Sequence, residues 1–169
     1  AVAQSAALRR GEVSVEELTR AYVQRIERLQ PQLAAFVQLA PERALKMARR
    51  LDTEKRRDPQ QARGPLWGLP TAMKDIHMTR GYFIRVGSRA FRYLWSPIDD
   101  VSSAAIRRAG LVLLGKLTTS ELAILPIVDT ELHPPTRNPH DRDRYSGGSS
   151  GGSGAAIASG MLPIAVASD

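Results

Sequence analysis

Residues 145–169 read Tyr-Ser-Gly-Gly-Ser-Ser-Gly-Gly-Ser-Gly-Ala-Ala-Ile-Ala-Ser-Gly-Met-Leu-Pro-Ile-Ala-Val-Ala-Ser-Asp. The first half is almost entirely glycine and serine, a composition typical of flexible linkers. The second half contradicts a linker, because residues 155–158 form an apolar run that suits a helix and Gly160 stands where a glycine ends one. Residues 162–167 then predict a buried strand. The glycines therefore lead into packed structure.

Glycines placed just before a helix let the backbone and small hydroxyls approach a bound group, because no Cβ intervenes. Such a loop can cradle a phosphate or present serine hydroxyls. A Walker-type loop would continue with lysine, and no lysine follows Gly152 or Gly154. A dinucleotide fingerprint would need its third glycine where Ile157 stands. The stretch is therefore expected to present serine hydroxyls, which need a base.

Lys74 is the candidate base, at the end of a short apolar segment that follows a turn at Pro70. An ordinary lysine, with a pKa of about 10.4, is almost fully protonated at pH 7. Burial beside Leu69 and Met73 would lower this pKa and supply some neutral amine. The alternative is a surface lysine paired with Asp75, and spacing alone favours that alternative.

Four motifs, in this order, resemble the amidase signature family. They are Gly-Pro-Leu-x-Gly-Leu-Pro-x-x-x-Lys-Asp at 64–75, Gly-Lys-x-x-x-x-Glu-Leu-Ala at 115–123, Thr-Arg-Asn-Pro-His-Asp at 136–141 and Gly-Gly-Ser-Ser-Gly-Gly-Ser at 147–153. The resemblance runs from about Val13 to Asp169. One motif alone is weak evidence, whereas four in order are specific.

The resemblance implies an α/β fold, with a mixed central sheet covered by helices on both faces and here truncated. Residues 1–169 are then the N-terminal portion of a single amidase domain. We expect a helical region over about 1–60 and a catalytic α/β core over about 61–169 that continues beyond the chain.

Members of this family use a Ser-cis-Ser-Lys triad. The resemblance assigns the lysine to Lys74 and the bridging serine to Ser149, whose preceding peptide bond is expected to be cis. The implied reaction is acyl transfer, in which neutral Lys74 accepts a proton from Ser149 while Ser149 accepts one from the nucleophilic hydroxyl. The same comparison gives substrate contact or loop support to Gly148, Ser150, Gly151 and Ala123.

The third member of the triad, the nucleophilic serine, is expected beyond Asp169, and so is the oxyanion hole. Ser153 and Ser168 lie close to that segment, but neither matches the position of the nucleophile. Neither serine is therefore expected to be the nucleophile.

Cysteine is absent, which excludes disulfides, a thiol nucleophile and cysteine-based zinc sites. His77, His133 and His140 show no paired spacing with carboxylates, so no metal is expected. The implied chemistry also needs no cofactor. No run of 18 or more apolar residues occurs, and we expect a soluble, cytoplasmic protein with no membrane partner.

Lys and Arg number 24 against 17 Asp and Glu, a formal net charge of +7 that raises the question of nucleic acid. Aromatic residues are sparse and do not alternate with the basic ones, as a single-strand binding platform would require. Solvated helix faces are therefore favoured over nucleic acid as the place of the scattered arginines Arg9, Arg10, Arg49, Arg50, Arg56, Arg57 and Arg63.

The first helix is predicted from Ser14, which forms a capping box with Glu17, to about Leu29. Pro31 is expected to stop it. Residues 35–39 are apolar and predict a strand or a buried connector.

Pro41 suits the first turn of a second helix, which runs to about Arg57 and carries a basic outer face. Polar residues with Pro59 and Gly64 predict a loop over 58–64. The residues expected to face inward from the second helix are Leu45, Ala48 and Leu51.

A third helix is predicted from a cap at Asp99 or Asp100 to Ala109, ended by Gly110. Residues 111–114 predict a fully buried strand, and helix, glycine and apolar strand in succession are typical of an α/β sheet. Lys116 is expected as an ordinary polar residue after that strand.

Three functions remain open. The favoured one is a stand-alone amidase acting on a small-molecule amide, with a homodimer as the assembly to be considered. The second is the glutamine-hydrolysing subunit of a tRNA-dependent amidotransferase, although that subfamily usually has Asp-Glu-Phe-Ala-Met-Gly where residues 120–125 read Ser-Glu-Leu-Ala-Ile-Leu. The third is a non-catalytic basic α/β binding module in which Lys74 and Ser149 are structural.

Overall fold

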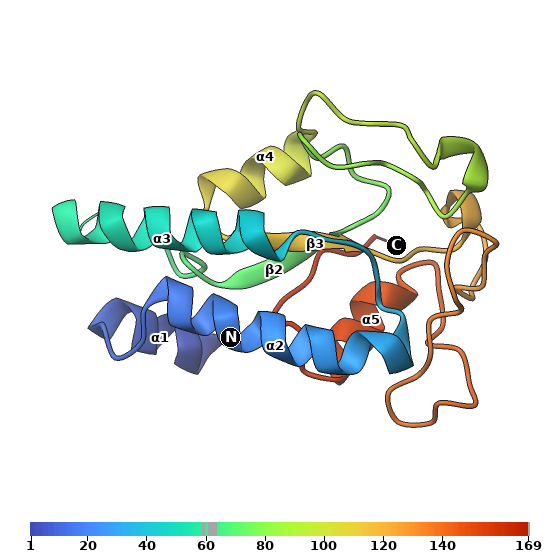
Figure 1. The fold of residues 1–169 in the computed structure, drawn as a ribbon, viewed down its shortest axis with the longest axis horizontal. Coiled ribbons are helices and arrows are strands. Elements are labelled where there is room, and N and C mark those ends of the chain that lie inside the picture. The colour runs from blue at the N-terminus through green and yellow to red at the C-terminus, as the bar shows by residue number, and fades with distance from the viewer. Residues whose placement is uncertain (59, 61–63, 169) are drawn as a thin grey trace.

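The computed structural model describes residues 1–58, 60 and 64–168 of the 169-residue chain. One sheet has the strand order β1-β3-β2, in which β3 (Val112–Leu117) runs antiparallel to β1 (Phe36–Leu39) and parallel to β2 (Pro70–Lys74). In Figure 1, α4 (Val101–Arg108) lies above this sheet, while α2 (Val15–Leu33) and α5 (Gly151–Ala158) lie below it. The predicted α/β class, a mixed sheet with helices on both faces, is confirmed.

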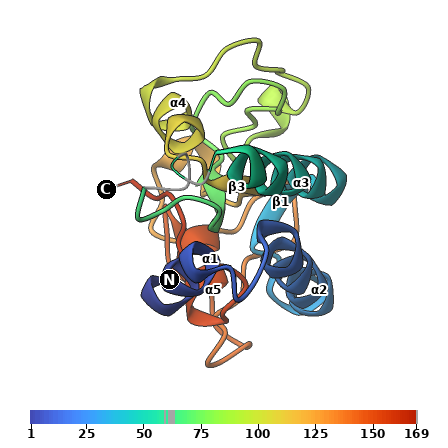
Figure 2. The same ribbon diagram turned by 90° about the vertical axis from the view of Figure 1, so that its left-hand side faces the viewer.

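Two further helices complete the N-terminal part, α1 (Val2–Arg10) and α3 (Pro41–Arg57). Figure 2 shows α2 and α3 side by side next to β1. Because β1 belongs to the first 60 residues and pairs with β3, this helical region contributes to the same sheet as the later strands. The main apolar core lies between the sheet and these helices and includes Leu8, Ile26, Ala48, Leu114 and Ala156.

The start of α2 is confirmed, but its predicted end is wrong. The Ser14 hydroxyl accepts from the Glu17 backbone N–H at 3.1 Å, and the Glu17 carboxylate accepts from the Ser14 N–H at 2.8 Å. The helix continues through Pro31 to Leu33. In the last turn the proline removes only one backbone hydrogen bond, and the Ala34 N–H closes the helix on the Gln30 carbonyl at 2.9 Å.

α3 has the predicted bounds, with Pro41 in its first turn. Ala44, Ala48 and Leu51 are buried, whereas Leu45 is only half-buried, so Leu45 was wrongly placed on the inward face. The loop predicted over 58–64 includes residues 59 and 61–63, which lie outside the described residues.

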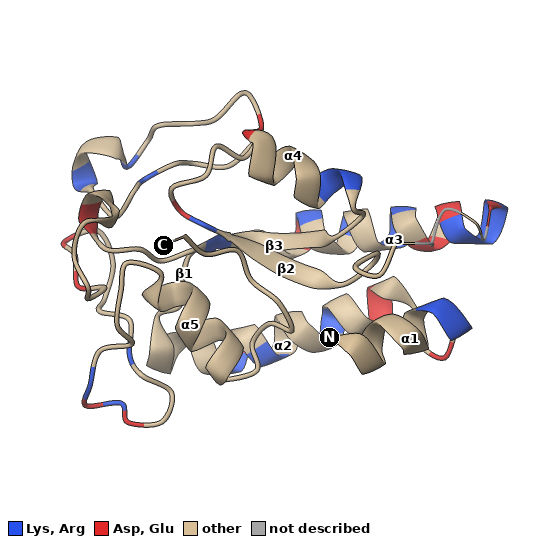
Figure 3. Ribbon diagram, turned by 180° about the vertical axis from the view of Figure 1, so that it is seen from behind, with Lys and Arg blue, Asp and Glu red and all other residues tan. Residues whose placement is uncertain are grey.

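The cationic side chains gather where helix dipoles favour them. The last turns of α1, α3 and α4 carry Arg9 and Arg10, Lys55 to Arg57, and Arg107 and Arg108, as Figure 3 shows. Positive charge near the C-terminus of a helix is stabilising, by roughly 0.3 to 1 kcal/mol at an exposed site. Much of the basic excess therefore lies at solvated helix ends.

Asp100 is the cap of α4, with its carboxylate accepting from the Ser103 N–H at 2.7 Å, and Gly110 follows the helix in the left-handed region at φ 73°. β3 extends to Leu117, three residues beyond the predicted end, and all six of its residues are buried. The strand predicted over 162–167 is wrong. In the described part of the chain, one backbone hydrogen bond joins this segment to β2, from the Val166 N–H to the Ala72 carbonyl, and Pro163 has no N–H to donate.

No helix among the described residues is both long enough and apolar enough to cross a bilayer.

α5 begins inside the glycine run, and its first turn packs closely against the backbone of other segments. A Cβ on Gly152 would lie 2.5 Å from the Thr118 nitrogen and 2.6 Å from the Ala35 carbonyl oxygen. A Cβ on Gly154 would meet nothing within 4 Å. Gly152 is thus required for close packing, whereas Gly154 is not.

We expect Gly152→Ala to destabilise the complete protein by about 1 to 3 kcal/mol, because the added methyl group overpacks a rigid backbone contact. The matched change Gly154→Ala should leave stability unchanged or raise it by up to about 1 kcal/mol, since alanine favours a helix over glycine. Urea denaturation of both variants tests this. Equal changes in stability at the two positions would show that the close backbone contact does not require glycine at position 152.

Candidate active site

Lys74 is the last residue of β2 and is fully buried, with 0 % of its surface exposed. Its Nζ donates to the Ser149 Oγ at 2.7 Å and to the Ser168 Oγ at 2.7 Å. Ser149 lies in the loop before α5, and Ser168 lies on the segment after that helix. The strand end therefore delivers one amine to two hydroxyls that are distant from it in the sequence.

No carboxylate offsets the burial of this amine among the described residues. Asp75 is ion-paired with Lys116, with 3.2 Å between its Oδ1 and the Lys116 Nζ. The alternative of a surface Lys74 paired with Asp75 is therefore wrong. Burial lowers the pKa of the Lys74 ammonium from its usual value, because the charged form loses solvation. This is the direction that a general base requires.

The ion pair between Asp75 and Lys116 is itself buried. Lys116 lies within β3 with 0 % of its surface exposed, and it donates to the His77 carbonyl at 2.7 Å. The Asp75 Oδ2 accepts from the Arg85 N–H at 3.0 Å. The expectation of an ordinary polar residue after the strand is wrong. The sequence signal for the burial of Lys116 was its position between the apolar residues Leu114 and Leu117.

The loop that carries Ser149 is held between two other segments. The Gly148–Ser149 peptide bond is cis, as predicted. The Ser149 carbonyl accepts from the Ser120 N–H at 3.3 Å. A Cβ on Gly148 would lie 2.7 Å from the Ile127 nitrogen and 2.8 Å from the Leu125 oxygen, so glycine allows this loop to pack directly on residues 125–127.

Ser168 is the residue that sequence reasoning set aside and that the structure brings to Lys74. Its N–H donates to the Ser150 Oγ at 3.2 Å, and the Ser150 hydroxyl donates to its carbonyl at 2.9 Å. The predicted support from Ser150 is thus a pair of hydrogen bonds between the two loops. The only sequence signal for Ser168 was its place just before Asp169, which lies outside the described residues. Ser153, by contrast, donates to the Val166 carbonyl at 2.8 Å and does not contact Lys74.

The other two predicted positions flank the same loop. A Cβ on Gly151 would lie 2.6 Å from Val128, which explains the glycine at the start of α5. Ala123 lies in a turn with φ 59° and donates its N–H to the Ser120 carbonyl at 3.0 Å. Because Ser120 also bonds to Ser149, this turn is adjacent to the serine loop.

The histidines lie in separate surroundings. His77 Nδ1 is 2.9 Å from the Asp100 Oδ2, and His133 Nδ1 is 2.9 Å from the Pro134 oxygen. Over residues 1–58, 60 and 64–168, no group of three or more His, Cys, Asp or Glu side chains could share a metal ion.

Comparison with known proteins decides the family. A family model described as Amidase matches residues 17–169. The chain belongs to the Amidase family. Membership confirms the resemblance that the four motifs indicated.

Amidase relatives include a glutamyl-tRNA(Gln) amidotransferase subunit of Thermobifida fusca, 40 % identical over 164 residues that cover 97 % of this chain and 32 % of that protein. A solved structure described as a vestigial protein complex that reveals the evolutionary origins of an s-triazine catabolic enzyme matches with a TM-score of 0.92 at 34 % identity. That match covers 99 % of this chain and 36 % of the other.

Native peptide amidase from Stenotrophomonas maltophilia is a further structural relative in the Amidase family. It matches with a TM-score of 0.87 at 35 % identity, over 97 % of this chain and 34 % of that one. This Amidase chain spans about a third of the length of the curated relatives it matches.

Proposed function

We propose that this chain supplies the lysine and the bridging serine of a Ser-cis-Ser-Lys amidase. The enzyme hydrolyses a carboxylic acid amide to the acid and ammonia or an amine. The observation that supports this most is the 2.7 Å contact between Lys74 Nζ and Ser149 Oγ, at a buried amine with no carboxylate partner in the described residues. A lysine in a purely structural role would normally be paired with an anion at such a depth.

In the proposed mechanism, neutral Lys74 removes the proton from Ser149 as Ser149 removes the proton from the nucleophilic serine, expected beyond Asp169. The nucleophilic oxygen bonds to the amide carbon and forms a tetrahedral intermediate. When the C–N bond breaks, the proton returns through Ser149 to the leaving nitrogen, and water then hydrolyses the acyl-enzyme. Ser168, whose hydroxyl accepts the other hydrogen bond from Nζ, is a positioning residue that orients the Lys74 amine.

A second candidate is the glutaminase subunit of a tRNA-dependent amidotransferase. It is supported by the names of relatives such as the Thermobifida fusca protein, at 40 % identity. Against it stands the apolar stretch at residues 122–127, Leu-Ala-Ile-Leu-Pro-Ile, beside the serine loop. Residues 120–125, Ser-Glu-Leu-Ala-Ile-Leu, also depart from the Asp-Glu-Phe-Ala-Met-Gly that this subfamily usually has there. We therefore favour a stand-alone cytoplasmic amidase of small-molecule amides.

The test is ammonia release by the complete enzyme from a panel of simple aliphatic and aryl amides and from glutamine, without any added partner. We expect turnover of simple amides by the enzyme alone. Turnover of glutamine only after a second subunit is added would favour the amidotransferase. If the protein binds an amide without hydrolysing it, and replacing Lys74 leaves that binding unchanged, the non-catalytic module would be favoured.

A further inference from the structure

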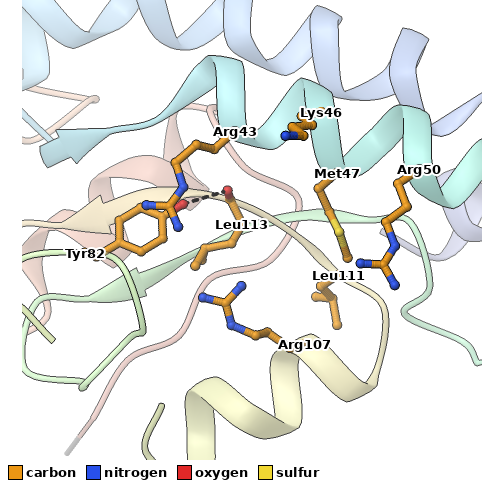
Figure 4. Close-up of a pocket in the computed structure, with 8 residues that line it drawn as sticks. All are labelled: Arg43, Lys46, Met47, Arg50, Tyr82, Arg107, Leu111 and Leu113. Carbon is orange, nitrogen blue, oxygen red and sulfur yellow. Dashed lines mark hydrogen bonds between the residues drawn. The ribbon is translucent and has the colours of Figure 1, made fainter. Parts of the chain in front are cut away.

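A groove of about 380 Å³ lies between α3 and α4 over β3, and it shares no residue with the Lys74 site. Cationic side chains line it from both helices, with Arg43, Lys46 and Arg50 on α3 and Arg107 on α4. Figure 4 shows Arg50 and Arg107 reaching into the space between the helices. Among the described residues that line it, none is acidic. Its volume falls within the range of small-molecule sites, about 300 to 1,000 Å³.

Two of the guanidinium groups are held in place by contacts that leave other donors unused. Arg43 lies 4.4 Å above the centre of the Tyr82 ring and donates to the Gly81 carbonyl. Arg107 contacts Asp99 through its Nε, at 2.9 Å and 3.1 Å from the two carboxylate oxygens, and donates to the Arg80 carbonyl at 3.0 Å. Because these groups are already ordered, binding an anion would cost little side-chain entropy.

The charge around the groove is not balanced. Asp99 pairs with Arg107, and Glu54 pairs with Arg50 at 2.6 Å. Lys46 makes no hydrogen bond or ion pair within the described part of the chain. Asp99 is also shared with Arg80, at 4.0 Å. The two carboxylates therefore neutralise the four lining cations only in part, and a ligand with two negative charges would match the excess positive charge.

The floor of the groove is apolar. Leu111 and Leu113 close its bottom, and Met47 and the methylene stems of the cations form its sides. A ligand that fits both parts has a charged end and an apolar body. A phosphate ester is favoured over a carboxylate, because a phosphate monoester carries about −1.5 to −2 charges at pH 7 and arginine binds it through paired N–H donors.

We propose that this groove binds a phosphate monoester with an apolar body, at a site separate from the amidase centre. The experiment is calorimetric titration of the complete protein with 1-naphthyl phosphate, and in parallel with inorganic phosphate and with 1-naphthol. We expect 1-naphthyl phosphate to bind at least tenfold more tightly than either of the others, since each of them carries only half of the recognised chemistry.

The double variant Lys46→Ala, Arg50→Ala should weaken binding of 1-naphthyl phosphate at least tenfold. Arg49→Ala is the matched control, because Arg49 is on the same helix and pairs with Glu16 at 3.0 Å outside the groove. This control should bind as the wild type does. Lys74→Ala should also bind normally, which separates this proposal from the proposed amidase activity.

If the wild type does not bind 1-naphthyl phosphate, the proposal is overturned. This result is also expected if another part of the polypeptide occupies the groove. Equal binding of inorganic phosphate and 1-naphthyl phosphate overturns the assigned ligand class. Equal loss in Arg49→Ala and in the double variant would show a general charge effect and also overturns the proposal.

Discussion

Replacing Lys74 with alanine in the complete enzyme should lower kcat for amide hydrolysis by roughly 10³-fold or more, because the proposed general base is removed. The fold should persist, since the described residues place no charged partner against Lys74 and the loss is one of packing and two hydroxyl contacts. Ammonia release under saturating substrate measures kcat, and circular dichroism checks the fold.

Lys74→Arg is the informative companion variant. Arginine keeps the positive charge and can donate to both serines, but it cannot become neutral at accessible pH. We expect it to be as inactive as the alanine variant. Near wild-type turnover in either variant would contradict a proton-accepting role for Lys74.

The pH dependence follows from the same group. The proposed relay requires neutral Lys74, so kcat/KM should rise as pH rises and level off above the pKa of this amine. Because burial lowers that pKa, the rise should occur below the usual lysine value of about 10.4. A pH profile of kcat/KM on a neutral amide measures it. A rate that is highest when Lys74 is protonated would contradict the mechanism.

Local sequence signals predicted the parts of the fold that depend on neighbours in the chain. The capping box at Ser14, the cap at Asp100 and the glycine at 110 each satisfy backbone groups within a few residues. The motif order also predicted the contact between Lys74 and Ser149, because it fixed which lysine and which serine meet.

The features that the sequence did not predict depend on partners far along the chain. The burial of Lys116 is stabilised by Asp75, which follows another strand. The approach of Ser168 to Lys74 results from the packing of residues 164–168 beside β2 and Ser150, where hydrogen bonds replace the predicted strand. The cationic groove forms where the fold places α3 beside α4. No periodic pattern within either helix predicts that the other helix lies next to it.

Replacing Ser149 with alanine should also lower kcat by roughly 10³-fold or more, because Lys74 can then no longer receive the proton of the nucleophile through a bridging hydroxyl. Ammonia release by the complete enzyme measures this loss. Ser146→Ala is the matched control, since the same atom is removed from the same loop, and the only hydrogen bond of the Ser146 hydroxyl among the described residues is a 3.5 Å contact with the Gly147 carbonyl. It should retain most of the activity.

The double variant Lys74→Ala, Ser149→Ala distinguishes a relay from two independent contributions. Groups that act as a unit are strongly non-additive, so removing both should cost little more than removing one. If the two residues served separate functions, the losses would multiply, and the double variant would be about 10⁶-fold slower than the wild type. The 2.7 Å contact between Nζ and Oγ favours the first outcome, because Lys74 is the side chain to which the Ser149 hydroxyl is hydrogen-bonded in the described part of the chain.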